Sequence, residues 1–272
     1  MPSSPDVSSR QNPRFKTALA LRDARERRAR KRILVDGARE IGGALDAGIR
    51  VIEAWIATDR MRSQAARSLL PRLGASGAEI IETTPELLAR LAYGERDDGI
   101  VVVLEQPAAS LDGLELPERA LIAVVEQVEK PGNLGAVLRS ADGAGVDAVI
   151  AADPVSDIWN PNAIRASLGT IFSLPLVACS SAEALRFLRQ RDIAVLTARV
   201  GAQTDYDTAD FTMSVAIVVG AEVAGLSDAW SGPGVTPISI PMLGLADSLN
   251  VSASAAVLFY EARRQRRAAE TT

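Results

Sequence analysis

Residues 121–152, which run LIAVVEQVEKPGNLGAVLRSADGAGVDAVIAA, contain a complete β-α-β pattern. The apolar runs Leu121–Glu126 and Ala148–Ala152 predict two buried strands, and Leu134–Gly143 between them predicts a helix. Strands joined by a helical crossover are parallel. The loop Pro131–Gly135 therefore follows the carboxyl end of a strand, where open parallel sheets bind ligands, although a glycine-bearing turn of this kind is most often only a turn.

The same alternation continues toward the C-terminus. Further strands are predicted at residues 174–178, 193–197, 215–220 and 237–240, with helices at 162–168, 182–190 and 251–267. Apolar strands that alternate with helices predict an α/β domain over residues 119–267, with a mainly parallel sheet covered on both faces.

The N-terminal part predicts a second, smaller α/β module at residues 13–106. Its expected elements are one arginine-rich helix over Arg14–Arg32, strands at 33–35, 51–57, 79–82 and 100–105, and helices at 36–45, 63–73 and 85–91. Asp36 is expected to cap the helix that follows it. The polar residues 1–12 predict a disordered tail, and residues 107–118, rich in Pro, Ala, Asp and Gly, predict a linker.

The composition is that of an ordinary soluble globular protein, with 47% hydrophobic and 24% charged residues among 272. The sequence contains no histidine, which excludes Ser-His-Asp triads, Cys-His dyads and histidine-ligated zinc. The single cysteine, Cys179, forms neither an intrachain disulfide nor a thiolate zinc cluster. No apolar run approaches the ~20 residues of a membrane span, and no secretory segment opens the chain. We therefore expect a cytoplasmic protein with no metal and no membrane partner.

Charge is distributed unevenly along the chain. Residues 1–40 carry 11 Lys/Arg against 5 Asp/Glu, whereas residues 41–262 carry 15 against 28. A basic head on an acidic body indicates a polyanionic partner that contacts one region. A solvated, arginine-rich helix explains the same pattern equally well.

Two more loops follow predicted strands of the C-terminal domain. Residues 219–227 read VGAEVAGLS, and Glu222 among small residues is placed either to bind a polar ligand or to be solvated in a surface turn. Residues 240–242 read IPM and precede residues 248–254, SLNVSAS, which begin a predicted helix. This polar helix start offers oxygens and unpaired amides, as ordinary helix capping also does.

Taken together, the three loops resemble the SpoU (TrmH) family of RNA ribose 2′-O-methyltransferases in the SPOUT superfamily. The likeness covers residues 120–267 and includes residues 133–145, 160–169, 172–175, 220–227 and 240–252. Residues 12–16 and 34–40, with the arginine-rich helix between them, are similar to the substrate-binding domain that often precedes this catalytic domain. The chain is most similar to members that act on 23S ribosomal RNA, including actinomycete antibiotic-resistance enzymes.

The resemblance implies a trefoil-knotted α/β domain, a homodimer and the cofactor S-adenosylmethionine. It implies catalytic roles for five residues: Asn133, Arg139, Glu222, Asn250 and Ser252. The implied cofactor-binding residues are Thr197, Ala198, Gly220, Ala221, Gly225, Ile240, Met242, Ser248, Leu249 and Asn250. For the RNA, we expect contacts from Arg14, Lys16, Arg22, Arg25, Arg28, Arg32, Arg39 and Arg165.

The implied reaction is methyl transfer from a sulfonium to a ribose hydroxyl, which requires alignment of two reactants and removal of one proton. Family accounts make Arg139 the general base, but a guanidinium with a pKa above ~12 is difficult to deprotonate. We expect Arg139 instead to hold the target phosphate and stabilise charge on the 2′-oxygen. A transfer-RNA methyltransferase and a non-catalytic RNA-binding protein of the same fold are the alternatives.

Overall fold

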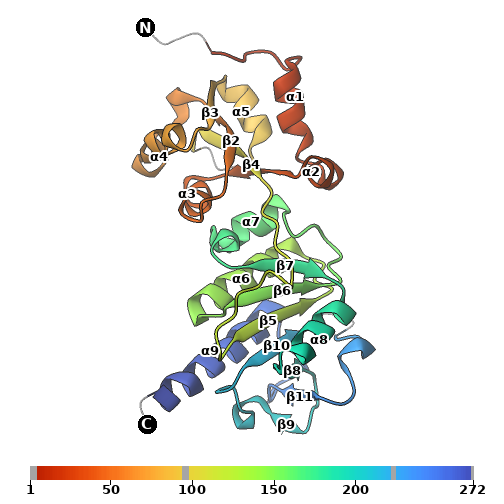
Figure 1. Cartoon of the computed structure of the whole chain (residues 1–272). Coiled ribbons are helices and arrows are strands. Elements are labelled where there is room, and N and C mark those ends of the chain that lie inside the picture. The colour runs from red at the N-terminus through yellow and green to blue at the C-terminus, as the bar shows by residue number, and fades with distance from the viewer. Residues whose placement is uncertain (1–4, 94–97, 222–224, 271–272) are drawn as a thin grey trace. The chain divides into compact units, whose positions relative to one another are not determined.

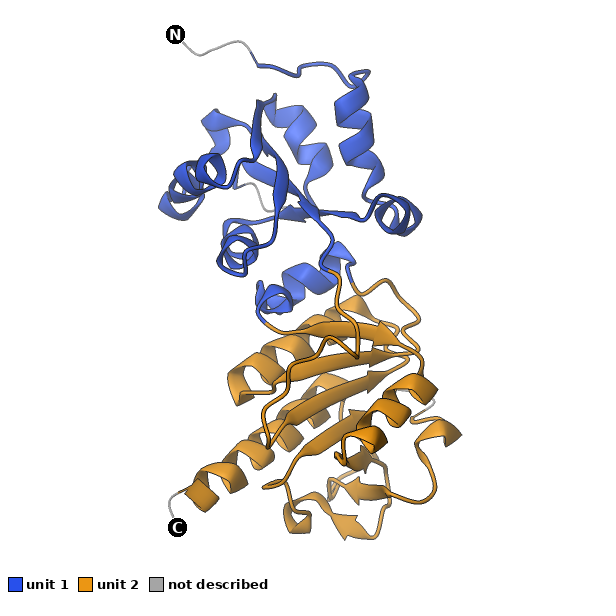
Figure 2. Ribbon diagram, in the orientation of Figure 1, with its two compact units in different colours: residues 1–107, 159–173 blue, residues 108–158, 174–272 orange. Residues whose placement is uncertain are grey.

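The computed structural model describes residues 5–93, 98–221 and 225–270 (Figure 1). The chain divides into two compact units (Figure 2): unit 1 comprises Met1–Pro107 and Trp159–Ser173, and unit 2 comprises Ala108–Ile158 and Leu174–Thr272. Residues 159–173 thus lie in unit 1, although the sequence pattern assigns them to the C-terminal domain.

Unit 1 is built around a four-stranded sheet. Its elements are α1 (Pro13–Ala20), α2 (Ala24–Arg30), β1 (Arg32–Asp36), α3 (Ala38–Asp46), β2 (Val51–Ile56), η1 (Thr58–Arg60), α4 (Gln64–Ala75), β3 (Glu79–Glu82), α5 (Pro85–Leu91), β4 (Ile100–Glu105), α7 (Pro161–Ser167) and η2 (Thr170–Phe172). The strand order is β1-β4-β2-β3, in which β4 is antiparallel to both of its neighbours and β3 is parallel to β2. Phe15 of α1 packs edge-on against the buried Trp55 of β2, with ring centroids 6.2 Å apart.

Three details of unit 1 differ from the prediction. The single helix expected over Arg14–Arg32 is two helices, because Leu21 turns into the core and the Asp23 carboxylate caps α2 by accepting from the amide of Arg25 at 2.7 Å. Val7 is buried and its amide donates to the Glu82 carbonyl, so the described residues 5–12 are not a disordered tail. Asp36 is no helix cap, because Gly37 occupies that position.

Unit 2 contains a seven-stranded sheet. Its elements are β5 (Leu121–Glu126), α6 (Pro131–Ala144), β6 (Ala148–Ala152), β7 (Leu176–Cys179), α8 (Ser181–Gln190), β8 (Ala194–Ala198), β9 (Thr204–Asp205), η3 (Tyr206–Thr208), β10 (Val215–Val219), η4 (Asp228–Trp230), β11 (Val235–Ser239) and α9 (Val251–Glu270). The strand order is β7-β6-β5-β10-β8-β11-β9, and every neighbouring pair is parallel. The predicted mainly parallel sheet is confirmed.

Helices cover both faces of this sheet (Figure 1). On one face, α8 and Trp230 pack against alternate strand residues such as Val124 and Val218. On the other, α6 and α9 lie side by side, since Arg263 of α9 donates to the Gly143 carbonyl at 2.8 Å. The predicted linker also differs from expectation, because Leu114 is buried in the core on the α8 face. None of the helices described is long and apolar enough to cross a membrane.

Candidate cofactor and active site

The three loops singled out by sequence leave from one edge of the unit 2 sheet. Strands β5, β10, β8 and β11 are consecutive neighbours and all parallel, so their carboxyl ends lie along the same edge. Residues 131–135 follow β5, residues 220–227 follow β10, and residues 240–250 follow β11. Thr197 and Ala198 end β8, between the second and third loops. The topology therefore gathers segments that are far apart in sequence.

The loop after β10 closes tightly on itself. The Gly225 amide donates to the Ala221 carbonyl at 3.0 Å, and Gly225 has a positive φ of 66°. A Cβ on Gly220 would lie 2.5 Å from the backbone carbonyl carbon and oxygen of Gly225. Only glycine fits such an approach, so Gly220 is required by the turn itself. The expected catalytic residue Glu222 lies outside the described residues.

The first loop opens directly into α6. Pro131 begins the helix, which places Asn133 in its first turn, where its amide donates to the Lys130 carbonyl at 3.0 Å. Arg139 lies farther along α6, is exposed, and makes no hydrogen bond or ion pair with any residue that the structure describes. Its guanidinium is therefore available to an outside anion.

The third loop ends at the start of α9. The Asn250 side-chain oxygen accepts from the amide of Ser252 at 3.0 Å and from its hydroxyl at 2.6 Å, so these two predicted site residues form one capping unit. Tyr260 of α9 lies against Gly143, where an added Cβ would be 2.9 Å from the phenol oxygen. Because α6 and α9 each begin directly after a loop at this edge of the sheet and lie side by side, the two helices run in the same direction.

Thr197 is the most unusual polar residue at this edge. Its side chain is fully buried at the end of β8, and its hydroxyl oxygen has no hydrogen-bond partner within the described part of the chain. A buried hydroxyl without a partner costs free energy. Thr197 is also one of the residues expected to bind the cofactor. A hydroxyl without a protein partner fits a binding site in which a ligand supplies the hydrogen-bond partner.

Sequence reasoning missed two residues that organise this edge. Glu126, the last residue of β5, is completely buried, and its carboxylate accepts hydrogen bonds from Ser181 and Ser227. Arg199 follows β8 and donates to the carbonyls of Leu226 and Ser227. The available signal was a charged residue that directly continues an apolar strand.

The basic residues expected to contact RNA fall into two groups: those whose side chains already have partners within unit 1, and those whose side chains have none among the described residues. Arg14 donates twice to Glu79 at 2.7 Å and once to Glu53 at 3.2 Å, and these carboxylates raise its pKa above the usual range. Arg22 donates to the Arg90 carbonyl at 2.7 Å and lies over the Tyr93 ring.

Two more of these residues also have partners within unit 1. Arg165 donates to the Tyr93 carbonyl and lies 3.9 Å from the buried Asp36 carboxylate, and Lys16 donates to Gln11 at 2.5 Å. By contrast, the exposed side chains of Arg25, Arg28 and Arg39 have no ion pair or hydrogen bond to other described residues, and Arg32 is half-buried.

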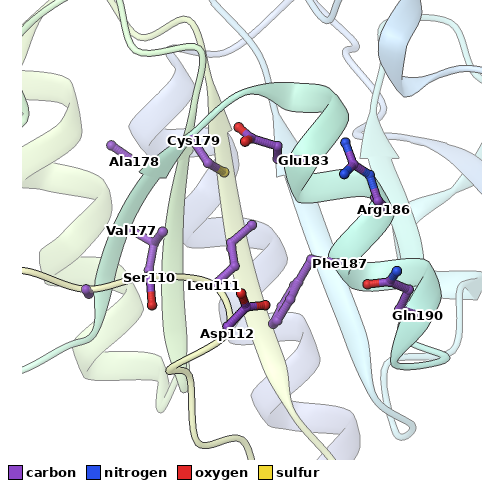
Figure 3. A pocket seen from close by; sticks show the side chains of 11 residues that line it. Ser110, Leu111, Asp112, Val177, Ala178, Cys179, Glu183, Arg186, Phe187 and Gln190 are labelled. Atoms are coloured by element: carbon purple, nitrogen blue, oxygen red, sulfur yellow. The ribbon is translucent and has the colours of Figure 1, made fainter.

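A cavity of about 370 Å³ lies elsewhere in unit 2, between residues 109–112, the end of β7 and α8 (Figure 3). Leu111, Phe187 and Cys179 line it, with Glu183 and Arg186 on α8. Burial raises the pKa of the Cys179 thiol to about 11, with smaller contributions from Glu183 and Asp153. None of the predicted site residues lines this cavity. Among the described residues, no group of acidic or cysteine side chains is arranged to hold a metal ion.

Comparisons with known proteins identify the same family that the three loops resemble. Residues 120–260 match the SpoU rRNA Methylase family, and residues 12–102 match the MRM3-like substrate binding domain. A 23S rRNA (uridine(2479)-2′-O)-methyltransferase from Streptomyces viridochromogenes is 35% identical, covering 97% of this chain and 94% of that protein. A 23S rRNA (guanosine-2′-O-)-methyltransferase RlmB from Ralstonia nicotianae is also 35% identical, covering 75% and 84%.

Solved structures give the same result. The SpoU methyltransferase AviRb from Streptomyces viridochromogenes, in complex with the cofactor AdoMet, superposes with a TM-score of 0.87 at 33% identity, covering 94% of this chain and 99% of that one. An RNA 2′-O ribose methyltransferase superposes with a TM-score of 0.83 at 38% identity, covering 96% and 99%. The predicted family is confirmed: the chain belongs to the SpoU rRNA methylase family.

Proposed function

We propose that this protein transfers a methyl group from S-adenosylmethionine to a ribose 2′-hydroxyl of 23S ribosomal RNA. The observation that carries the proposal is the common sheet edge, from which the loops after β5, β10 and β11 all leave. The relatives named as 23S rRNA 2′-O-methyltransferases support the substrate and the bond formed.

The residues at this edge fit S-adenosylmethionine. The unpartnered hydroxyl of Thr197 provides a polar contact, and the tight turn at Gly220 and Gly225 exposes backbone rather than side chain. The cofactor, when bound, supplies a methyl group on a sulfonium, which is already a good leaving group. The proposed binding residues are Thr197, Ala198, Gly220, Ala221, Gly225, Ile240, Met242, Ser248, Leu249 and Asn250.

Arg139 is proposed to grip the phosphate of the target nucleotide. Its guanidinium is exposed and uncommitted, it keeps its charge in proteins, and it presents several donors to phosphate oxygens in a planar fork. Held beside the reacting ribose, the same charge stabilises the negative charge that develops on the 2′-oxygen. Asn133, Asn250 and Ser252 would orient the ribose, and Glu222 completes the proposed set.

RNA binding is proposed to rest on Arg25, Arg28 and Arg39. These side chains are exposed and carry charge that no other described residue neutralises. Phosphate contacts of this kind give binding that weakens as salt rises. The 2′-hydroxyl is itself what distinguishes RNA from DNA, so selectivity for RNA follows from the reaction.

The proposal includes a knotted chain, a homodimer and action in the cytoplasm, as the family resemblance implies. Support for the dimer comes from the third loop, where Leu243 and Leu245 are fully exposed and Leu249 is 39% exposed. Apolar side chains that project from a cofactor loop are typical of a surface that another chain covers.

The test is methyl transfer from labelled S-adenosylmethionine to 23S ribosomal RNA, transfer RNA and the corresponding DNA. We expect label in ribosomal RNA alone. Arg139→Ala should abolish transfer while cofactor affinity, measured by calorimetry, stays at the parental value. An active Arg139→Ala variant would remove this residue from the mechanism, and label in transfer RNA would reassign the substrate.

A further inference from the structure

Glu126 is a buried carboxylate for which the proposed reaction has no use. Its side chain is fully inaccessible at the end of β5, and no Lys or Arg of the described chain forms an ion pair with it. Its charge is met instead by three donors: the Ser181 hydroxyl at 2.7 Å, the Ser227 hydroxyl at 2.6 Å and the Ser227 amide at 2.8 Å. Such a group is costly to bury unless its bonds serve a purpose.

Two of these three bonds end on the second cofactor loop. Ser227 closes the segment that begins at Gly220, so Glu126 connects the end of β5 to the loop that follows β10. The bonds link residues 101 positions apart in the chain. The donors are the amide and hydroxyl of one residue, which fixes the direction of the backbone there as well as its position.

Arg199 binds the same stretch through its backbone carbonyls, which accept hydrogen bonds, whereas Glu126 binds hydrogen-bond donors. Its guanidinium donates to the carbonyls of Leu226 at 3.4 Å, Ser227 at 3.2 Å and Trp230 at 3.1 Å. Its own amide donates to the Ile238 carbonyl of β11 at 2.9 Å. On the returning arm of the loop, the amide and hydroxyl of Ser227 are therefore bound by Glu126, and the carbonyls of Leu226 and Ser227 are bound by Arg199.

We propose that Glu126 and Arg199 are positioning residues for the methyl donor: they clamp Leu226 and Ser227 and thereby hold the adjacent turn of Gly220 and Gly225 in its cofactor-binding shape. The clamp connects the ends of β5, β8 and β10, which are three of the four strands whose ends carry the proposed site. Neither residue is proposed to touch the RNA, so the clamp acts on donor affinity. This inference rests on the proposed function.

The two serines provide a matched test. Ser227→Ala and Ser181→Ala each delete one hydroxyl bond of nearly equal length to the same carboxylate, but only Ser227 lies on the loop. We expect Ser227→Ala to raise the Kd for S-adenosylmethionine roughly tenfold, as is usual when a bond to a charged group is lost. Ser181→Ala should lower thermal stability about as much as Ser227→Ala does, but should change this Kd less than twofold.

Further variants separate positioning from general stability. Ser227→Thr keeps the hydroxyl and should restore the parental Kd, whereas Glu126→Gln and Arg199→Lys should raise it at least as much as Ser227→Ala does. In turnover assays, KM for S-adenosylmethionine should rise while kcat and RNA affinity change little. The full chain is used throughout, with donor binding measured by calorimetry.

The outcomes distinguish the clamp from the proposed function. A parent chain that does not bind S-adenosylmethionine refutes the proposed function and the clamp with it. If the parent binds the cofactor and Ser227→Ala binds equally well, the clamp alone is refuted. Equal losses of affinity in Ser227→Ala and Ser181→Ala would show that the carboxylate only stabilises the fold. Should Glu126→Gln fail to fold, the serine pair decides.

Discussion

Replacing Gly220 by alanine should damage the cofactor site far more than the fold. The new Cβ would lie 2.5 Å from the carbonyl carbon and oxygen of Gly225 and 2.7 Å from the amide nitrogen of Leu226. All three are backbone atoms, so no side chain can rotate away, and the pairing of Ala221 with Gly225 must open. Overpacking of this kind costs about 1–3 kcal/mol.

If the bound cofactor requires the original turn and the empty site lets the turn relax, this strain weakens binding, and the Kd for S-adenosylmethionine should rise roughly 5- to 150-fold. Calorimetry measures the Kd, and thermal unfolding measures the effect on stability. Gly74→Ala is the control, because its Cβ meets nothing within 4 Å and it lies in α4, where alanine adds about 0.5–1 kcal/mol of stability. A Gly220→Ala protein with parental donor affinity would show that this turn does not form the cofactor site.

Other predictions concern the basic head, the cysteine and assembly. Arg28→Ala should weaken RNA binding and reduce its salt dependence. Arg14→Ala should leave RNA affinity nearly unchanged and slightly lower the melting temperature, because Arg14 is already paired with carboxylates. Filter binding at several salt concentrations measures the RNA affinity of both variants. The thiol pKa of Cys179 is raised from 9.0 to about 11, so Cys179 should react with iodoacetamide roughly 100-fold more slowly than a free thiol at pH 8. The free energy of unfolding should also fall as pH rises from 9 toward 11, because in that range the thiol ionises only in the unfolded chain. Leu243→Asp with Leu245→Asp should convert a dimer to monomers in light scattering, whereas unchanged mass would exclude this loop from the interface.

Much of unit 2 was predictable because its signals are local. The central strands are mostly apolar runs, and Leu121–Glu126 and Ala148–Ala152 were predicted with the bounds that the structure has. Their parallel pairing followed from the helix between them. The loops at the carboxyl ends were found for the same reason, because the strands that end there are unmistakable.

The failures were long-range. A helical spacing of arginines runs through Leu21, and nothing local shows that the core on unit 1 draws this leucine in and breaks the helix. Charge alone also did not distinguish Arg14 from Arg28, because the carboxylate of Glu79 comes from a distant strand. Glu126 was missed likewise, since its partner Ser227 is remote in sequence. These contacts are set by tertiary packing, which a single sequence does not display.

Alkaline hydrolysis of 23S ribosomal RNA, after incubation with this protein and S-adenosylmethionine, examines the bond that the enzyme is proposed to form. A 2′-O-methyl group removes the nucleophile that alkali uses to cleave the adjacent phosphodiester, so one position should become resistant to cleavage. The same position should stay sensitive with Arg139→Ala or without cofactor. Uniform cleavage in all samples, or a methyl group recovered on a base instead of a ribose, would contradict the proposed reaction.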